Sequence, residues 1–155
     1  MVCKLEEALH SYDPNFSRCQ SRALLCSLKG LAFRMDNGMY WSSMPAGIRG
    51  KDYRDYTGSF QVCQADGGKV KIIDYKDNVL GVDTSDVRNT TKAAKGNKAY
   101  LFEFQLVYHK DKVAFRSTNG KFVCRIYYTK DMTSLEAVKD IADDNCLFER
   151  VGAEL

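Results

Sequence analysis

The chain has 155 residues, which is enough for one folded domain with a sizeable buried core. Its hydrophobic content of 45% and aromatic content of 12% exclude a disordered chain, which would be poor in apolar residues and rich in net charge. A net charge of only +3 argues against a dedicated nucleic-acid-binding protein, and no apolar run approaches the roughly 20 residues of a membrane-spanning helix.

The first segment, residues 1–21, is predicted to be an N-terminal extension that is partly helical. Four apolar residues share one face of a short helix over residues 4–12, and Pro14 ends it because the residue before a proline avoids the α region. The segment opens with a charged, amphipathic stretch and lacks the apolar core of a secretory signal peptide. We therefore expect a cytoplasmic protein.

The chain contains six cysteines, and in the cytoplasm we expect them to remain thiols. Cys26, Cys63 and Cys124 lie in apolar, strand-like contexts, where a free cysteine packs as a small hydrophobic residue.

Residues 113–123 are predicted to form a β-hairpin. Apolar and polar residues alternate up to Ser117, as in a strand with one buried face. Asn119 and Gly120 follow, and this dipeptide favours the positive φ angles of a tight hairpin turn. A second apolar strand then begins at Phe122.

The same pattern occurs twice more, at residues 31–41 and 70–80, so that copies lie about 40 residues apart. The middle copy has Asp77 and Asn78 where the other copies have Asn-Gly, so its turn signal is weaker. A second marker keeps a similar period, since Phe60, Phe104 and Phe148 are spaced by about 44 residues. Two markers with one period predict three similar units of several short strands.

Local signals assign the segments between the hairpins. Residues 45–58 and 84–98 are predicted to be polar loops. Thr133 and Glu136 have the spacing of a helix capping box, which predicts a turn or two of helix over residues 134–142.

Aromatic residues gather in the first unit, at Tyr40, Trp41, Tyr53 and Tyr56. Aromatic rings on a loop can stack on a sugar or a peptide, whereas buried rings pack in the core or at its rim. The sequence leaves both alternatives open.

Three units of about four strands predict an all-β domain over residues 22–155. The expected architecture is a β-trefoil of about 12 strands, in which six strands close a barrel and three hairpins cap one end.

The stretch from Val113 to Phe122, with the closing Cys146-Leu147-Phe148, resembles the fascin-like β-trefoils over about residues 22–151. The segment 145–149 also resembles a motif of fibroblast growth factors, with Glu149 one position early. Either resemblance implies the same fold, and neither fixes the function because trefoils host many functions.

Catalytic and metal-ligating candidates are few. No local signature supports a nucleophile pair around His10 or His109, the two histidines. Cys3, His10, Cys19 and Cys26 do not have the paired spacing of a structural zinc site. We expect a non-enzymatic protein that needs no metal and no cofactor.

Basic residues cluster around the third hairpin and are predicted to form a partner-binding patch. They are Lys110, Lys112, Arg116, Lys121 and Arg125. Strand alternation points Arg116 and Arg125 away from the core, where they could bind actin, a sulfated glycan or a phosphoinositide. An ordinary solvated surface would carry similar charges.

Three functions fit these observations. The fascin-like resemblance implies a cytoplasmic, actin-binding or cytoskeletal protein-binding module. A lectin-like, carbohydrate-binding trefoil is an alternative, although the single Trp excludes the repeated Gln-x-Trp pattern of ricin-type lectins. A secreted ligand resembling growth factors or interleukin-1 is the third.

Overall fold

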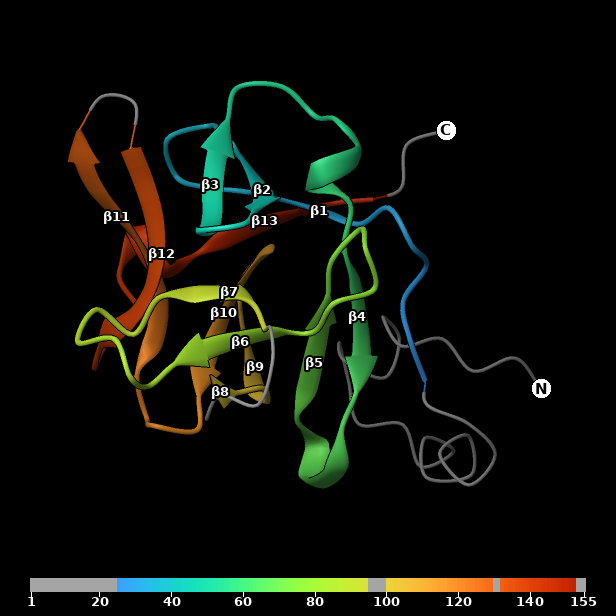
Figure 1. Ribbon diagram of the computed structural model, residues 1–155. Coiled ribbons are helices and arrows are strands. Elements are labelled where there is room, and N and C mark those ends of the chain that lie inside the picture. The colour runs from blue at the N-terminus through green and yellow to red at the C-terminus, as the bar shows by residue number, and fades with distance from the viewer. Residues whose placement is uncertain (1–24, 95–99, 130–131, 153–155) are drawn as a thin grey trace.

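The computed structural model describes residues 25–94, 100–129 and 132–152, and within these ranges the chain forms strands, turns and short 3-10 helices but no α-helix (Figure 1). The strands are β1 (Ala32–Arg34), β2 (Tyr40–Met44), β3 (Gly47–Lys51), β4 (Gln61–Gln64), β5 (Val70–Ile73), β6 (Leu80–Asp83), β7 (Thr91–Ala93), β8 (Tyr100–Leu101), β9 (Phe104–His109), β10 (Lys112–Ser117), β11 (Phe122–Thr129), β12 (Met132–Lys139) and β13 (Phe148–Val151). The 3-10 helices are η1 (Tyr56–Gly58), η2 (Asp66–Gly68) and η3 (Asp144–Cys146).

The expected all-β class is confirmed for this part of the chain. The extension predicted at residues 1–21, with its helix at 4–12, lies outside the described residues. No helix in the described ranges has the length and apolar character needed to cross a membrane.

Six strands pair side by side in antiparallel fashion, in the order β1, β13, β10, β9, β5 and β4. An isolated bridge between Leu31 and Phe60, with backbone hydrogen bonds of 2.8 and 3.0 Å, joins the residue ahead of β1 to the residue ahead of β4. Each of the six segments therefore has a paired neighbour on both sides.

Between these strands the chain makes three antiparallel pairs, β2 with β3, β6 with β7, and β11 with β12. The pair of β11 and β12 is the longest and extends to one side of the molecule (Figure 1). Strand β8 adds to the edge of β6, which makes a separate three-stranded sheet.

The three predicted hairpin turns are confirmed at residues 35–39, 74–78 and 117–121. In each turn, the first residue accepts a backbone hydrogen bond from the fourth and donates one to the fifth, over 2.7 to 3.0 Å. The fourth residue has a positive φ in all three turns, and it is Gly38, Asp77 and Gly120 respectively.

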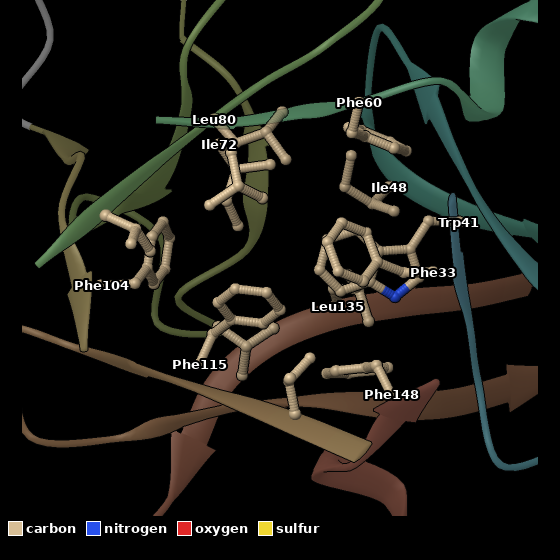
Figure 2. Close-up of a cluster of buried hydrophobic side chains, with 14 of the residues drawn as sticks. Phe33, Trp41, Ile48, Phe60, Ile72, Leu80, Phe104, Phe115, Leu135 and Phe148 are labelled. Atoms are coloured by element: carbon tan, nitrogen blue, oxygen red, sulfur yellow. The ribbon is translucent and has the colours of Figure 1, made fainter. Parts of the chain in front are cut away.

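Aromatic side chains from all three units meet in one buried cluster (Figure 2). Its rings belong to Phe33, Trp41, Phe60, Phe104, Phe115 and Phe148, which are all 0 to 1% exposed. The centroid of Phe33 lies 4.5 Å from that of Trp41 and 5.4 Å from that of Phe115. Such tilted and edge-on contacts add to the stabilisation from burial alone.

The helix predicted over residues 134–142 is wrong, because this stretch forms most of β12 and pairs along β11. Leu135 and Ala137 are fully buried in the core, which gives the stretch more apolar burial as a strand. Glu136 does not cap a helix; its carboxylate accepts a 3.0 Å hydrogen bond from Arg88 Nε. Tertiary pairing has overridden the capping-box pattern.

The two predicted loops also contain strands, since β3 lies within residues 45–58 and β7 within residues 84–98. In β7, Lys92 is not part of a free charged surface, because its ammonium group lies 3.0 Å from the carboxylate of Asp83.

The expectation that Cys26 and Cys63 stay reduced is wrong in this structure. The two residues lie opposite each other in an isolated antiparallel bridge and form a disulfide. Cys124 is a buried free thiol, as expected for a small hydrophobic residue.

We expect Phe115→Ala to lower the free energy of unfolding by about 3–5 kcal/mol, because it leaves a cavity where rings from several strands meet. Phe122→Ala is the matched control, since that ring is only partly buried and should cost about 1–2 kcal/mol. Urea denaturation of both variants measures the difference, and equal losses would contradict a core centred on Phe115.

Candidate functional site

A surface pocket of about 280 Å³ lies beside the turn at residues 74–78. Its walls come from three places in the chain: the segment ahead of β1, the region from η1 to the start of β4, and the turn itself. The lining residues are Lys29, Gly30, Tyr56, Ser59, Phe60, Gln61, Asp74, Tyr75 and Asp77.

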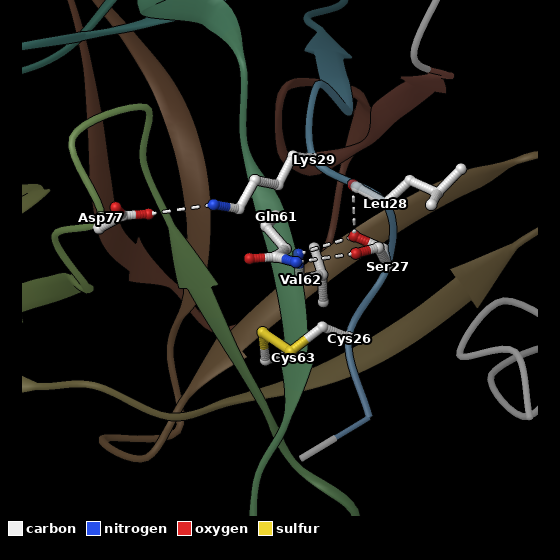
Figure 3. Close-up of a disulfide and its surroundings, with 8 residues drawn as sticks. All are labelled: Cys26, Ser27, Leu28, Lys29, Gln61, Val62, Cys63 and Asp77. Atoms are coloured by element: carbon white, nitrogen blue, oxygen red, sulfur yellow. Dashed lines mark hydrogen bonds and ion pairs between the residues drawn. A yellow bond between two sulfur atoms is a disulfide. The ribbon is translucent and has the colours of Figure 1, made fainter. Parts of the chain in front are cut away.

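The segment ahead of β1 is fixed against β4 by several contacts (Figure 3). The Cys26–Cys63 disulfide joins the two covalently. Ser27 N–H donates to the Val62 carbonyl at 2.7 Å, and Val62 N–H donates to Ser27 Oγ at 3.0 Å. Gln61 Nε2 donates to the Ser27 carbonyl at 3.0 Å. These contacts hold one wall of the pocket in place.

A buried carboxylate organises the turn at residues 74–78. Asp74 is only 6% exposed, and its Oδ1 accepts 2.9 Å hydrogen bonds from the backbone N–H groups of Lys76 and Asn78. Its Oδ2 accepts a 2.9 Å hydrogen bond from Ser43 Oγ on β2. The carboxylate therefore stabilises the turn from inside and ties it to the neighbouring strand.

The other two turns are stabilised differently. Asn37 and Asn119 sit within their own turns, and their side chains accept from the backbone N–H two residues on. Each is followed by a glycine, which adopts positive φ at little cost.

Asp77 occupies the position where those turns have glycine, with a φ of 64°. A residue with a Cβ is strained in this conformation by about 1 kcal/mol, although Asp tolerates it better than most. Strain that surrounding contacts maintain is frequent at functional sites. In this conformation the Asp77 carboxylate lies at the rim of the pocket, 3.7 Å from Lys29 Nζ.

Two tyrosines give the pocket an aromatic side. Tyr56 is 72% exposed, and its ring meets that of Tyr75 edge-on at a centroid distance of 5.4 Å. Lys76 Nζ lies 5.6 Å from the centre of the Tyr75 ring. The exposed ring of Tyr56 is available to stack on a ligand.

The position of Tyr56 depends on Asp55, the N-cap of η1. The Asp55 side chain accepts a 3.0 Å hydrogen bond from the backbone N–H of Thr57. Hydrogen bonds from Lys51 Nζ and then from the Thr57 side chain hold the pKa of the Asp55 carboxyl below its usual range.

The structure does not gather the predicted basic patch at one point. Lys110 lies in the turn between β9 and β10, and Lys112 begins β10, about 13 Å along the strand from Arg116. Lys121 pairs with the carboxylate of Asp140, and Arg125 makes two hydrogen bonds of 2.6 and 3.0 Å to Asp36. Partner binding by the patch stays a prediction.

Other sequence candidates fall elsewhere. His109 is exposed at the end of β9, whereas Cys3, His10 and Cys19 lie outside the described residues. The described part of the chain contains no group of three or more His, Cys, Asp or Glu placed to hold a metal ion.

The aromatic residues of the first unit include both a core ring and a ring at the candidate site. Trp41 is in the core, whereas Tyr56 lines the pocket. Sequence reasoning missed Tyr75 and Asp77, and the one available signal was the unusual turn sequence of the middle hairpin.

Comparison with known proteins gives a fold likeness only. No family model and no curated protein matches the chain. The crystal structure of Cry35Ab1 is similar with a TM-score of 0.65 and 12% identity, over 81% of this chain and 36% of that one. The GlcNAcα1-4Gal releasing endo-β-galactosidase from Clostridium perfringens is similar with a TM-score of 0.64 and 10% identity, over 81% of this chain and 32% of that one.

This chain therefore spans about a third of the length of each similar structure. At such low identity, the likeness supports a β-rich fold and leaves the function to be argued from the site.

We expect Asp77→Gly to raise the free energy of unfolding by about 0.5 kcal/mol, because glycine relieves the positive-φ strain at a solvent-exposed position. The ion pair with Lys29 is too exposed to offset this gain. Asp77→Ala is the control, since it removes the carboxylate but keeps the strain. Urea denaturation compares the two variants. If Asp77→Gly is less stable than Asp77→Ala, the backbone at Asp77 is not strained.

We expect the stabilisation from Asp55 to be lost in acid. Its folded-state pKa is lowered, so the contribution is fully present above the ordinary Asp value of 3.8 and decreases as the pH falls below it. Urea denaturation of the wild type and Asp55→Asn at a series of pH values from 6 downwards measures the difference between their unfolding midpoints. This difference should shrink below pH 3.8. A difference independent of pH would contradict a charged role for Asp55.

Proposed function

We propose that this chain is a β-trefoil that acts as a non-enzymatic carbohydrate-binding module. The fold proposal is supported by the six strands that pair around a ring, the three intervening strand pairs and the three equivalent turns. A β-trefoil is built from these parts.

The pocket beside the 74–78 turn is the observation that carries the proposed function. A sugar presents apolar C–H faces and a ring of hydroxyl groups, so it is bound by an aromatic surface next to hydrogen-bonding groups. Tyr56 supplies the exposed ring, and Asp77, Lys29 and Gln61 supply a carboxylate, an ammonium group and an amide around one hollow.

The charge of the lining favours a neutral ligand. Asp74 and Asp77 are acidic and Lys29 is basic, so the lining offers no excess of positive charge to a sulfated or phosphorylated group. One similar structure is an enzyme named for releasing GlcNAcα1-4Gal, and a glycan partner agrees with that likeness.

The other functions expected from the sequence have weaker support. The fascin-like, actin-binding function follows from a resemblance of the repeat. In the basic patch that could contact actin, Lys121 and Arg125 are engaged by acidic neighbours. Actin binding stays a prediction, which co-sedimentation with filamentous actin tests. The growth-factor-like function also stays a prediction. Cytoplasmic localisation also stays a prediction, although disulfides such as Cys26–Cys63 persist mainly in oxidising compartments.

We expect the protein to bind members of a glycan array, and we expect Tyr56→Ala to weaken that binding by about 10-fold because it removes the stacking surface. Isothermal titration calorimetry with the strongest array ligand measures the change.

Tyr53→Ala is the matched control, because Tyr53 is similarly exposed at 60% but does not line the pocket. An array without any binding would overturn the proposed function. Equal losses from the two tyrosine variants would place the site elsewhere.

A further inference from the structure

A second, smaller hollow of about 40 Å³ adjoins the pocket, since Asp74 and Tyr75 line both. It extends the site toward β2 and β7. The residues that line it are Ser43, Met44, Pro45, Asp74, Tyr75, Lys76, Asn78 and Ala93.

The size of the small hollow limits what enters it. Its volume of about 40 Å³ is about one seventh of the 280 Å³ of the larger pocket. It exceeds the roughly 10–15 Å³ that a single water molecule needs. A sugar ring fits only the larger pocket, so the small hollow accepts a small substituent that projects from the ring.

The chemistry of the small hollow is mixed. Met44, Pro45 and Ala93 make one side apolar. Asn78 contributes a side-chain amide that makes no hydrogen bond within the described part of the chain, so it can donate to or accept from a ligand. Ser43 Oγ is already engaged, because it donates to Asp74.

A methyl group carried on an amide matches both sides of such a hollow. Its methyl would contact the apolar side chains, and its carbonyl or N–H would pair with the Asn78 amide. Among common sugar substituents, the acetamido group has this structure, and it projects from the ring at a single carbon.

We propose that the ligand is an N-acetylated sugar, with its ring in the larger pocket against Tyr56 and its acetamido group in the small hollow. This inference rests on the proposed carbohydrate-binding function. It names the class of sugar that the site selects.

Matched ligand pairs test the proposal by isothermal titration calorimetry on the full chain. The first pair is N,N′,N″-triacetylchitotriose and cellotriose, which differ only in the acetamido or hydroxyl group at C2 of each ring. The second pair is the methyl glycosides of N-acetylgalactosamine and galactose. We expect the N-acetylated member to bind about 10-fold more tightly, from one buried methyl group and one added hydrogen bond.

Two variants assign the preference to the small hollow. Ala93→Leu should fill it and bring the affinity ratio close to 1, but Ala93 is 8% exposed and its enlargement can disturb the fold. Asn78→Ala removes the amide at a partly exposed position and should reduce the ratio without repacking the core.

The outcomes separate the two proposals. Glycan binding with equal affinity within each ligand pair overturns the acetamido inference and leaves the carbohydrate-binding function standing. A preference that persists in both folded variants also overturns it, because the selecting group then lies outside the small hollow. Absence of binding to every glycan overturns both.

Discussion

The structure depends on the convergence of large rings from different strands on one point. These rings belong to Phe33, Trp41, Phe60, Phe115 and Phe148. Because side chains alternate along a strand, a slip of one residue in any of these strands would turn its ring outward. The cluster therefore fixes the register of the surrounding strands, and it leaves the turns at their ends free to vary in sequence.

The candidate site uses that freedom at one turn out of three. With the strands fixed by the core, Asp74 takes over the local contact that asparagine makes in the other turns, because it accepts from the backbone N–H of Asn78, and it adds a contact to β2. Asp77 and Tyr75 of this turn line the pocket together with Tyr56. The same carboxylate also borders the small hollow, so one buried group shapes both parts of the proposed site.

The sequence predicted what depends on local chemistry and on repetition, namely the hairpin turns, the strand-rich class and the spacing of the phenylalanines. It could not predict features that depend on tertiary register. The spacing of Thr133 and Glu136 suits a helix cap equally well, and only pairing with β11 decides for a strand. Cys26 and Cys63 bond because the fold sets them opposite each other. Tyr75 reaches the pocket only after separate segments assemble.

The pairing of β1 with β13 has a consequence for how the chain is made. Arg34 and Glu149 on these strands are 115 positions apart and join through two hydrogen bonds of 2.8 and 2.9 Å. During synthesis, the ribosome must therefore release almost the whole described sequence before β1 meets this partner. Until then the nascent chain exposes an unpaired strand edge, which other chains can recognise, so rapid completion protects it from aggregation.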